Sequence, residues 1–335
     1  MKNKILGGVY GQALGDAFAM PALLTPRDTW NYYHGWITTF HPGPDFHPFH
    51  SGMVAGRVTD DSEQAFALAE EIIREGGVSV EGIARAVMNW YDRVDGDNCP
   101  YVGPSTRRAV LAMKRGVDLK QTGRFGDTNG ASMRVSPVGL IHPGDIESAV
   151  QDAYLSCIPT HNTNVAVSGA AAIAGAIAAA LVDGSTLDDI IAAGVRASEM
   201  GRASTESWIG ASVGRRIEMA VQIARSARPE LDRLQDIYDL VGATLAITEA
   251  VPSAFGVLVM AEGDPLKTAM YAAQLSGDAD TIGAMAVAMA GAWKGIEAFP
   301  AWVVEGLRTA NPEFDFDALA EGLYQLALAN SRKPE

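Results

Sequence analysis

Two short acidic clusters hold the residue types in this sequence that are best suited to chemistry. They are Thr59-Asp60-Asp61-Ser62-Glu63 and Ser276-Gly277-Asp278-Ala279-Asp280-Thr281. Each combines closely spaced carboxylates with a hydroxyl, and each comes directly before a segment with helical periodicity. Because Asp, Ser and Thr also cap helix N-termini, either cluster alone has a structural explanation, including a capping-box variant of Asp60 with Glu63.

As a pair, the clusters indicate a site for hard metal ions. Carboxylate and hydroxyl oxygens suit Mg²⁺ or Mn²⁺. Four carboxylates exceed what one Mg²⁺ normally takes from a protein, so a two-metal centre would use them all. The spacing in sequence does not show by itself that the clusters meet in space.

The composition narrows the class of protein. The chain has 335 residues, of which 48% are apolar, and a formal net charge of −14. An acidic surface repels phosphate backbones and anionic membranes, so we expect neither nucleic acid nor membrane as a partner. With only Cys99 and Cys157, a disulfide scaffold and a Cys-rich zinc site are excluded. We therefore expect a reduced, soluble, cytoplasmic protein.

The elements that must position the clusters are helices, because apolar residues recur at helical spacing and alternating patterns are scarce. An uncharged run at 165–182 is long enough to span a bilayer, but its Ala and Gly favour a buried, closely packed helix. No composition shift marks a boundary, so residues 1–335 are predicted to form one compact all-α domain. The predicted helices cover 63–74, 80–91, 104–114, 145–156, 163–182, 187–199, 205–225, 265–275, 281–298 and 316–329.

Residues 21–57 lack this periodicity and form an irregular segment rich in aromatic residues and histidine. The segment holds four of the six histidines of the chain: His34, His41, His47 and His50. Three interpretations are open: a lid over a substrate, a small core of its own, or a zinc site built from the histidines. The irregular histidine spacing fits no common zinc pattern, so the first two are favoured.

Five dispersed motifs carry a resemblance to a known family. They are Gly11-Gln12-Ala13-Leu14-Gly15-Asp16-Ala17, Thr59-Asp60-Asp61-Ser62, Asn129-Gly130-Ala131-Ser132-Met133-Arg134, Thr160-His161 and Ser276-Gly277-Asp278-Ala279-Asp280-Thr281. In order and separation they resemble the motifs of the ADP-ribosylglycohydrolase family. The resemblance extends over most of the chain, and five motifs in register are far more specific than any one.

The resemblance implies a fold and a site. The fold would be a multi-helix orthogonal bundle with a central cleft holding two Mg²⁺ or Mn²⁺ ions. The implied metal ligands are Thr59, Asp60, Asp61, Asp278, Asp280 and Thr281. The implied substrate-binding residues are Gly103, Ser105, Asn129, Gly130, Ala131, Ser132, Met133 and His161. For His161 a purely structural role, as a cap or a core histidine, stays open.

The implied reaction is hydrolysis at the anomeric carbon of ribose in an ADP-ribosyl conjugate, for example ADP-ribosyl-arginine on a protein. Asp61 and Asp278 are the candidates for moving the proton, and the sequence does not choose between them. One alternative is an N-ribosidase for a smaller compound such as a nucleoside, which the aromatic segment would enclose well. Another is a non-catalytic member resembling the lens crystallins, although a structural role does not need four convergent carboxylates.

The chain also departs from the family pattern. The last motif of the family commonly reads Gly-Gly-Asp-Thr-Asp-Thr, and this chain has Ser276 and Ala279 at the first and fourth places. Some relatives position a glutamate over the metals from the segment before the first acidic cluster, where this chain has none. We expect Asp28 or Asp45 to replace it, or the leaving group to be handled differently.

Overall fold

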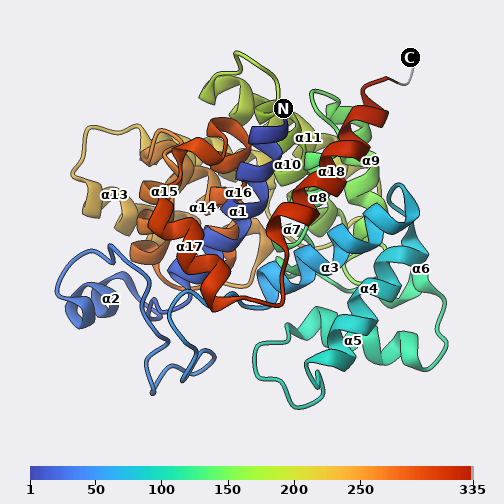
Figure 1. The fold of residues 1–335 in the computed structure, drawn as a ribbon, viewed down its shortest axis with the longest axis horizontal. Coiled ribbons are helices and arrows are strands. Elements are labelled where there is room, and N and C mark those ends of the chain that lie inside the picture. The colour runs from blue at the N-terminus through green and yellow to red at the C-terminus, as the bar shows by residue number, and fades with distance from the viewer. Residues whose placement is uncertain (333–335) are drawn as a thin grey trace.

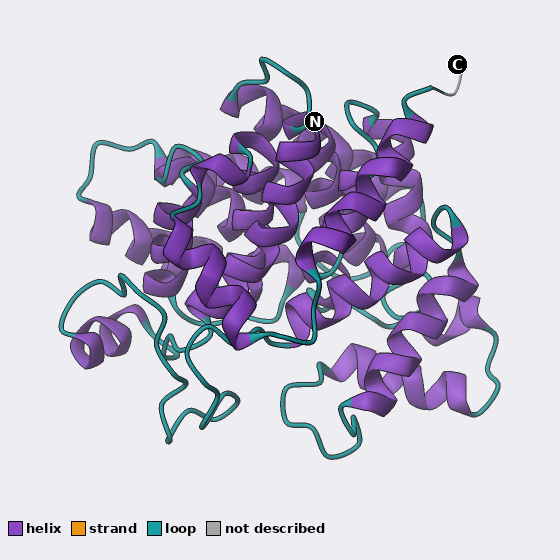
Figure 2. Cartoon of the chain, viewed as in Figure 1, coloured by secondary structure: helices purple, strands orange, loops and turns teal. Residues whose placement is uncertain are grey.

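Helices supply the regular structure in the computed structural model, which describes residues 1–332 (Figure 2). No strand occurs in this range, where the β-type pairing is a single isolated bridge between Thr128 and Ala246. The all-α prediction is therefore confirmed. The helices are α1 (Lys2–Ala19), α2 (Pro26–Tyr33), α3 (Asp60–Glu75), α4 (Val80–Arg93), α5 (Pro104–Lys114), α6 (Leu119–Thr122), α7 (Gly130–Met133), α8 (Ser136–Leu140), α9 (Ile146–Cys157), α10 (Asn164–Ala180), α11 (Leu187–Ala203), α12 (Val213–Ala224), α13 (Glu230–Asp236), the π-helical turn η1 (Ile237–Val241), α14 (Ile247–Met260), α15 (Pro265–Leu275), α16 (Ala279–Lys294), the 3-10 turn η2 (Ile296–Ala298), α17 (Ala301–Ala310) and α18 (Phe316–Asn330).

The helix pair α1 and α16 forms the centre of the molecule (Figure 1). Glycines let the two backbones touch. A Cβ placed on Gly15 would lie 1.9 Å from the carbonyl oxygen of Gly283, and one on Gly283 would lie 2.3 Å from the carbonyl oxygen of Gly15. No side chain fits in either direction. This contact brings Asp16, the next residue of α1, to the beginning of α16.

The uncharged run at 165–182 is a buried helix, as its small residues predicted. Every residue of α10 is buried, and it packs mainly against α9 and α11. No helix among residues 1–332 combines the length and apolar character needed to cross a membrane.

Residues 21–57 contain one helix that the sequence analysis did not predict. The side chain of Thr25 caps α2, Pro26 opens it, and His34 ends it in the left-handed conformation at φ 55°. With eight residues, α2 is too short to show a helical period. The remainder is irregular and lies with α2 at the lower left of Figure 1.

Two of the wrong helix boundaries have a clear local cause. The helix predicted at 205–225 begins only at Val213, because the side chain of Ser212 caps it and Gly210 adopts a φ of 156°. The helix predicted at 281–298 ends at Lys294, because Gly295 takes a φ of 77° and the chain turns into η2. In both cases a glycine with positive φ breaks an otherwise helical pattern.

Candidate active site

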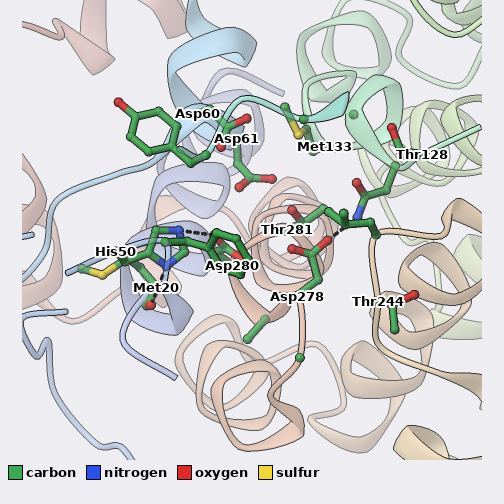
Figure 3. A pocket seen from close by; sticks show the side chains of 18 of the residues that line it. Met20, His50, Asp60, Asp61, Thr128, Met133, Thr244, Asp278, Asp280 and Thr281 are labelled. Atoms are coloured by element: carbon green, nitrogen blue, oxygen red, sulfur yellow. Dashed lines mark hydrogen bonds and ion pairs between the residues drawn. The ribbon is translucent and has the colours of Figure 1, made fainter. Parts of the chain in front are cut away.

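The two acidic clusters meet at one cavity of about 370 Å³ (Figure 3). The N-terminus of α3 contributes Asp60 and Asp61 to its wall, and the N-terminus of α16 contributes Asp278, Asp280 and Thr281. The segment 19–50 and the loop 100–104 also contribute residues to the wall. The structure therefore shows that the two acidic clusters lie at the same cavity, which their spacing in the sequence did not establish.

On the α3 side, Asp16 organises the turn that carries the carboxylates. Its carboxylate accepts hydrogen bonds from the backbone N–H of Thr59 at 3.0 and 3.1 Å and from that of Ser62 at 3.1 Å. The Oγ1 of Thr59 lies 2.9 Å from a carboxyl oxygen of Asp16 and 2.9 Å from one of Asp61. Since a hydroxyl has one hydrogen, it satisfies only one of these oxygens at a time. The Oδ1 of Asp61 is buried and has no hydrogen-bond partner among the described residues.

On the α16 side, each carboxylate has one nitrogen partner. The amide of Asn129 donates to Oδ2 of Asp278, and Nε2 of His50 lies 3.2 Å from Oδ2 of Asp280. The other ring nitrogen of His50 lies 3.0 Å from the carbonyl oxygen of Met20. Because both partners of the ring are acceptors, His50 fits the site as a doubly protonated cation.

A buried arginine supports the carboxylate of Asp60 through a glutamine. Arg134 is 1% exposed and donates from Nη1 to Oε1 of Gln64 at 2.8 Å and from Nη2 to the hydroxyl of Thr160 at 2.6 Å. Gln64 in turn donates from Nε2 to Oδ2 of Asp60 at 3.2 Å. Burial lowers the pKa of Arg134 to about 10, and electrostatic interactions with Cys157 and Asp60 oppose that shift. Gln64 therefore has its amide oriented with the nitrogen toward Asp60.

Burial and mutual repulsion make the carboxyls difficult to ionise. Burial raises the pKa of Asp16 to about 7, although hydrogen bonds from Thr59 and Ser62 oppose the rise. Burial and the charge of Asp280 together raise the pKa of Asp278 to about 7. The same two causes raise the pKa values of Asp60 and Asp61 well above the ordinary range.

The ion pair of His50 with Asp280 is the exception. Burial alone would raise the pKa of Asp280, but the charge and hydrogen bond of His50 hold it below its ordinary value. Burial alone would lower the pKa of His50, but Asp280 raises it to about 9. One imidazolium thus accompanies five carboxyls. Its single positive charge is too small to balance the negative charge that the carboxyls would carry if all of them were ionised.

The structure brings four of the eight sequence-predicted substrate residues to the cavity. Gly103, Asn129, Gly130 and Met133 line it. Behind that wall lie Thr59, Ser105, Ala131, Ser132 and His161, all of them buried.

His161 lies directly beneath Gly130. A Cβ on Gly130 would approach Cε1 of the imidazole to 2.9 Å, and the ring nitrogens of His161 lie 3.0 and 2.8 Å from the hydroxyls of Thr128 and Thr160. Burial lowers its pKa well below the ordinary value. In this structure His161 packs behind the loop that contains Thr128 and Gly130.

Two residues of the site, Asp16 and His50, were named in the sequence analysis but were not predicted as members of this site. Asp16 gave one usable signal, because it is the one charged residue between Lys4 and the end of α1, and a charge in an otherwise uncharged buried helix requires a partner. His50 gave none, since its neighbours in sequence have no periodicity.

The expected substitutes for a glutamate over the metals do not reach the cavity. Asp28 is exposed and accepts a hydrogen bond from Thr25 at 2.7 Å at the beginning of α2, and Asp45 is exposed in the following loop. Neither lines the cavity, which overturns the expected substitution and leaves the alternative that the leaving group is handled differently. The segment 21–57 contributes His47, Phe49 and His50 instead.

The three interpretations of residues 21–57 have different outcomes. The aromatics contact one another in pairs such as Trp30 with Trp36 and Tyr32 with Phe46, as a small core would. Phe49 nevertheless lines the cavity. The histidines form no zinc site, because His47 bonds the carbonyl oxygen of Ala22 and no group of three His, Cys, Asp or Glu suited to a metal occurs in residues 1–332.

Comparison with known proteins identifies the family. The sequence model of the ADP-ribosylglycohydrolase family matches residues 1–333. The chain belongs to the ADP-ribosylglycohydrolase family. This confirms the resemblance inferred from the five motifs, and the match extends over nearly the whole chain.

The chain is also similar to individual proteins over most of its length. Protein YegU of Escherichia coli (strain K12) is 37% identical over 326 residues, which are 96% of each chain. ADP-ribosylhydrolase ARH3 of Bos taurus is 26% identical over 80% of this chain and 78% of its own. A solved structure of an ADP-ribosylglycohydrolase-related protein complex superposes with a TM-score of 0.70 at 22% identity, covering 97% of this chain and 98% of that one. That structure shows that the fold is shared.

Proposed function

We propose that this protein is a metal-dependent hydrolase that cleaves the bond at the anomeric carbon of ribose in ADP-ribosyl conjugates, such as ADP-ribosyl-arginine on a protein. Membership of the ADP-ribosylglycohydrolase family supports a hydrolase of the glycosidase type. The single observation that carries the proposal is the convergence of four carboxyls and one imidazolium at the wall of a cavity, with the carboxyl of Asp16 bonded to the turn behind them.

The donor chemistry suits hard divalent cations, although within residues 1–332 the carboxylates are not already gathered into a group of three metal ligands. All the groups are carboxylate or hydroxyl oxygens, and one buried oxygen, Oδ1 of Asp61, has no partner among the described residues. We assign the binding of two Mg²⁺ or Mn²⁺ ions to the cavity-lining residues Asp60, Asp61, Asp278, Asp280 and Thr281. Thr59, the sixth predicted ligand, lies behind them, with its hydroxyl between Asp16 and Asp61. Such cations would offset the carboxylate charge and polarise the ribose hydroxyls and an attacking water.

The side chains of the chain itself would orient the substrate and move the proton. Asn129 and Gly130 line the cavity, and the absence of a side chain at Gly130 would let a ribose approach the backbone. Oδ1 of Asp61 is the atom we assign to accept the proton from water, because it makes no competing hydrogen bond. Asp278 is the second candidate, with its Oδ2 held by Asn129. Remaining negative charge would stabilise an oxocarbenium-like transition state.

One observation favours an N-ribosidase for a smaller compound as a second candidate. No Lys or Arg is among the residues that line the cavity, so the wall itself offers a diphosphate no cationic side chain other than histidine. Phe49 and Tyr101 line the same cavity and present aromatic surface suited to a base.

The test is product release, followed by mass spectrometry, with Mg²⁺, with Mn²⁺ and with chelator. The substrates are ADP-ribosyl-arginine and ADP-ribosyl-serine peptides, free ADP-ribose and simple nucleosides. Metal-dependent release of ADP-ribose supports the first proposal, and ribose from nucleosides alone supports the second. Asp61→Asn is expected to lower kcat by roughly 10²-fold or more, whereas the exposed control Asp45→Asn retains it. Equal activity of the two variants would remove Asp61 from the mechanism.

A further inference from the structure

An open groove of about 490 Å³ lies next to the candidate active site. It is lined by Val102, Pro104, Arg107, Arg108, Leu111 and Arg115. Val102 and Pro104 also line the catalytic cavity, so the two hollows share a wall. We call this second hollow the arginine groove.

Arg107 and Arg108 are consecutive residues of α5, and Arg115 caps its C-terminal end. Arg108 and Arg115 are separated by seven residues, which is about 10 Å along a helix. Arg107 donates to the carbonyl oxygens of Asp97 and Cys99, both at 2.8 Å, and Arg108 donates to that of Phe125 at 2.5 Å. These bonds to neutral carbonyls orient the guanidinium groups without neutralising them.

Positive charge is concentrated here in an otherwise acidic protein. Residues 100–126 contain six Lys or Arg and one Asp, whereas the chain carries a net charge of −14. Many cationic side chains elsewhere are ion-paired, but none of the three groove arginines pairs with a carboxylate within the described residues. The catalytic cavity, by contrast, is lined by carboxylates and lacks Lys and Arg.

This division of charge decides where phosphate can bind. A phosphate deep in the catalytic cavity would face carboxylates, whereas one across the shared wall would face guanidinium groups that bind phosphate in a bidentate manner. We propose that the arginine groove binds the phosphate groups of a ribosyl substrate while its anomeric carbon lies in the catalytic cavity. The inference rests on the proposed function for the identity of the substrate, but the phosphate site itself can be tested separately.

The experiment is calorimetric titration of the full chain with inorganic pyrophosphate in the presence of chelator. The wild type is expected to bind saturably. Because charge-assisted hydrogen bonds contribute about 1.5–3 kcal/mol each, the double variant Arg108→Gln/Arg115→Gln is expected to lose affinity by about tenfold or more. Arg107 is left intact because it holds two backbone carbonyls. The control is Arg93→Gln, which removes an exposed arginine outside the groove and is expected to change the affinity by less than about twofold.

Saturable binding that the double variant loses and the control keeps supports the groove. No binding by the wild type, retention by the double variant or an equal loss in the control would each overturn it. A third variant, Asp61→Asn, separates the two proposals, because it should abolish hydrolysis and leave pyrophosphate binding intact. If no ribosyl conjugate is cleaved while pyrophosphate binds as expected, the proposed function fails and the groove stands.

Discussion

The charge imbalance at the carboxyl cluster predicts that the metal-free protein loses stability as the pH rises. Asp16 and Asp278 each have a pKa raised from 3.8 to about 7 in the folded protein. Between these two values the folded state binds more protons than the unfolded state, so stability falls with increasing pH. His50 acts in the same direction, because its pKa of about 9 exceeds the ordinary 6.5 and the stability it provides is lost between those values.

The expected loss is large relative to the stability of a domain. A shift of about three pK units corresponds to about 4 kcal/mol for one such carboxyl. Because the carboxyls interact, the individual losses do not add, and about 4 kcal/mol is the scale for the cluster. A folded domain has about 5–15 kcal/mol in total, so the metal-free protein should be markedly less stable at pH 8 than at pH 5.

Urea unfolding at pH 5 and pH 8, with chelator and with Mg²⁺ or Mn²⁺, measures this effect. We expect the free energy of unfolding to fall by several kcal/mol between the two pH values in chelator and to recover when metal is added at pH 8. Asp278→Asn should flatten the pH dependence, whereas the exposed Asp45→Asn should not. Equal stability at the two pH values in chelator, or no response to either metal, would refute the charge argument.

Three further predictions concern packing, charge and the aromatic segment. Gly15→Ala is expected to cost about 3 kcal/mol of unfolding free energy, because its Cβ would lie 1.9 Å from a backbone carbonyl oxygen of α16. The control Gly77→Ala has open space around the new methyl group and should change the melting temperature little. Equal melting temperatures of the two variants would contradict the close contact. His50→Gln keeps a donor for its carboxylate partner but removes the charge, so Mn²⁺ affinity at pH 7 should rise by about threefold or more in a calorimetric titration, and a weaker affinity would mean that the imidazolium assists the metal. Phe49→Ala should raise KM about fivefold with kcat nearly unchanged, because Phe49 lines the cavity. The control is Phe46→Ala, which removes an exposed ring that packs on Tyr32 outside the cavity and should leave KM unchanged. Equal KM values for the two variants would exclude a covering role for the segment.

Where local chemistry determines an element, the sequence predicted it well. The helices at 104–114 and 265–275 have the predicted bounds, because Pro104 and Pro265 each fix the first turn. The short helix α2 was missed, since eight residues show no period. The failure at 205–212 has a related cause, because apolar residues there mimic a helical stripe while Gly210 takes a φ of 156°.

The candidate active site was likewise predicted only in part from the sequence. Asp60, Asp61, Asp278 and Asp280 were found because each pair lies within one turn, and they line the cavity as a group. The contribution of Asp16 was missed because it depends on contact between distant segments. Neither that contact nor the placement of residues such as His50 leaves a periodic trace in the sequence.

The backbone contact between α1 and α16 has a consequence for how the protein is made. The two helices are separated by about 260 residues of chain, so α1 leaves the ribosome long before its partner exists. At translation rates of about 5–20 residues per second, the interval is on the order of tens of seconds. Throughout it, the apolar surface of α1 lacks its final cover and the carboxyl cluster is incomplete. A chain that stops before α16 would therefore lack both its central packing and its chemistry, so that truncated products would be substrates for chaperones and proteases rather than partly active enzymes.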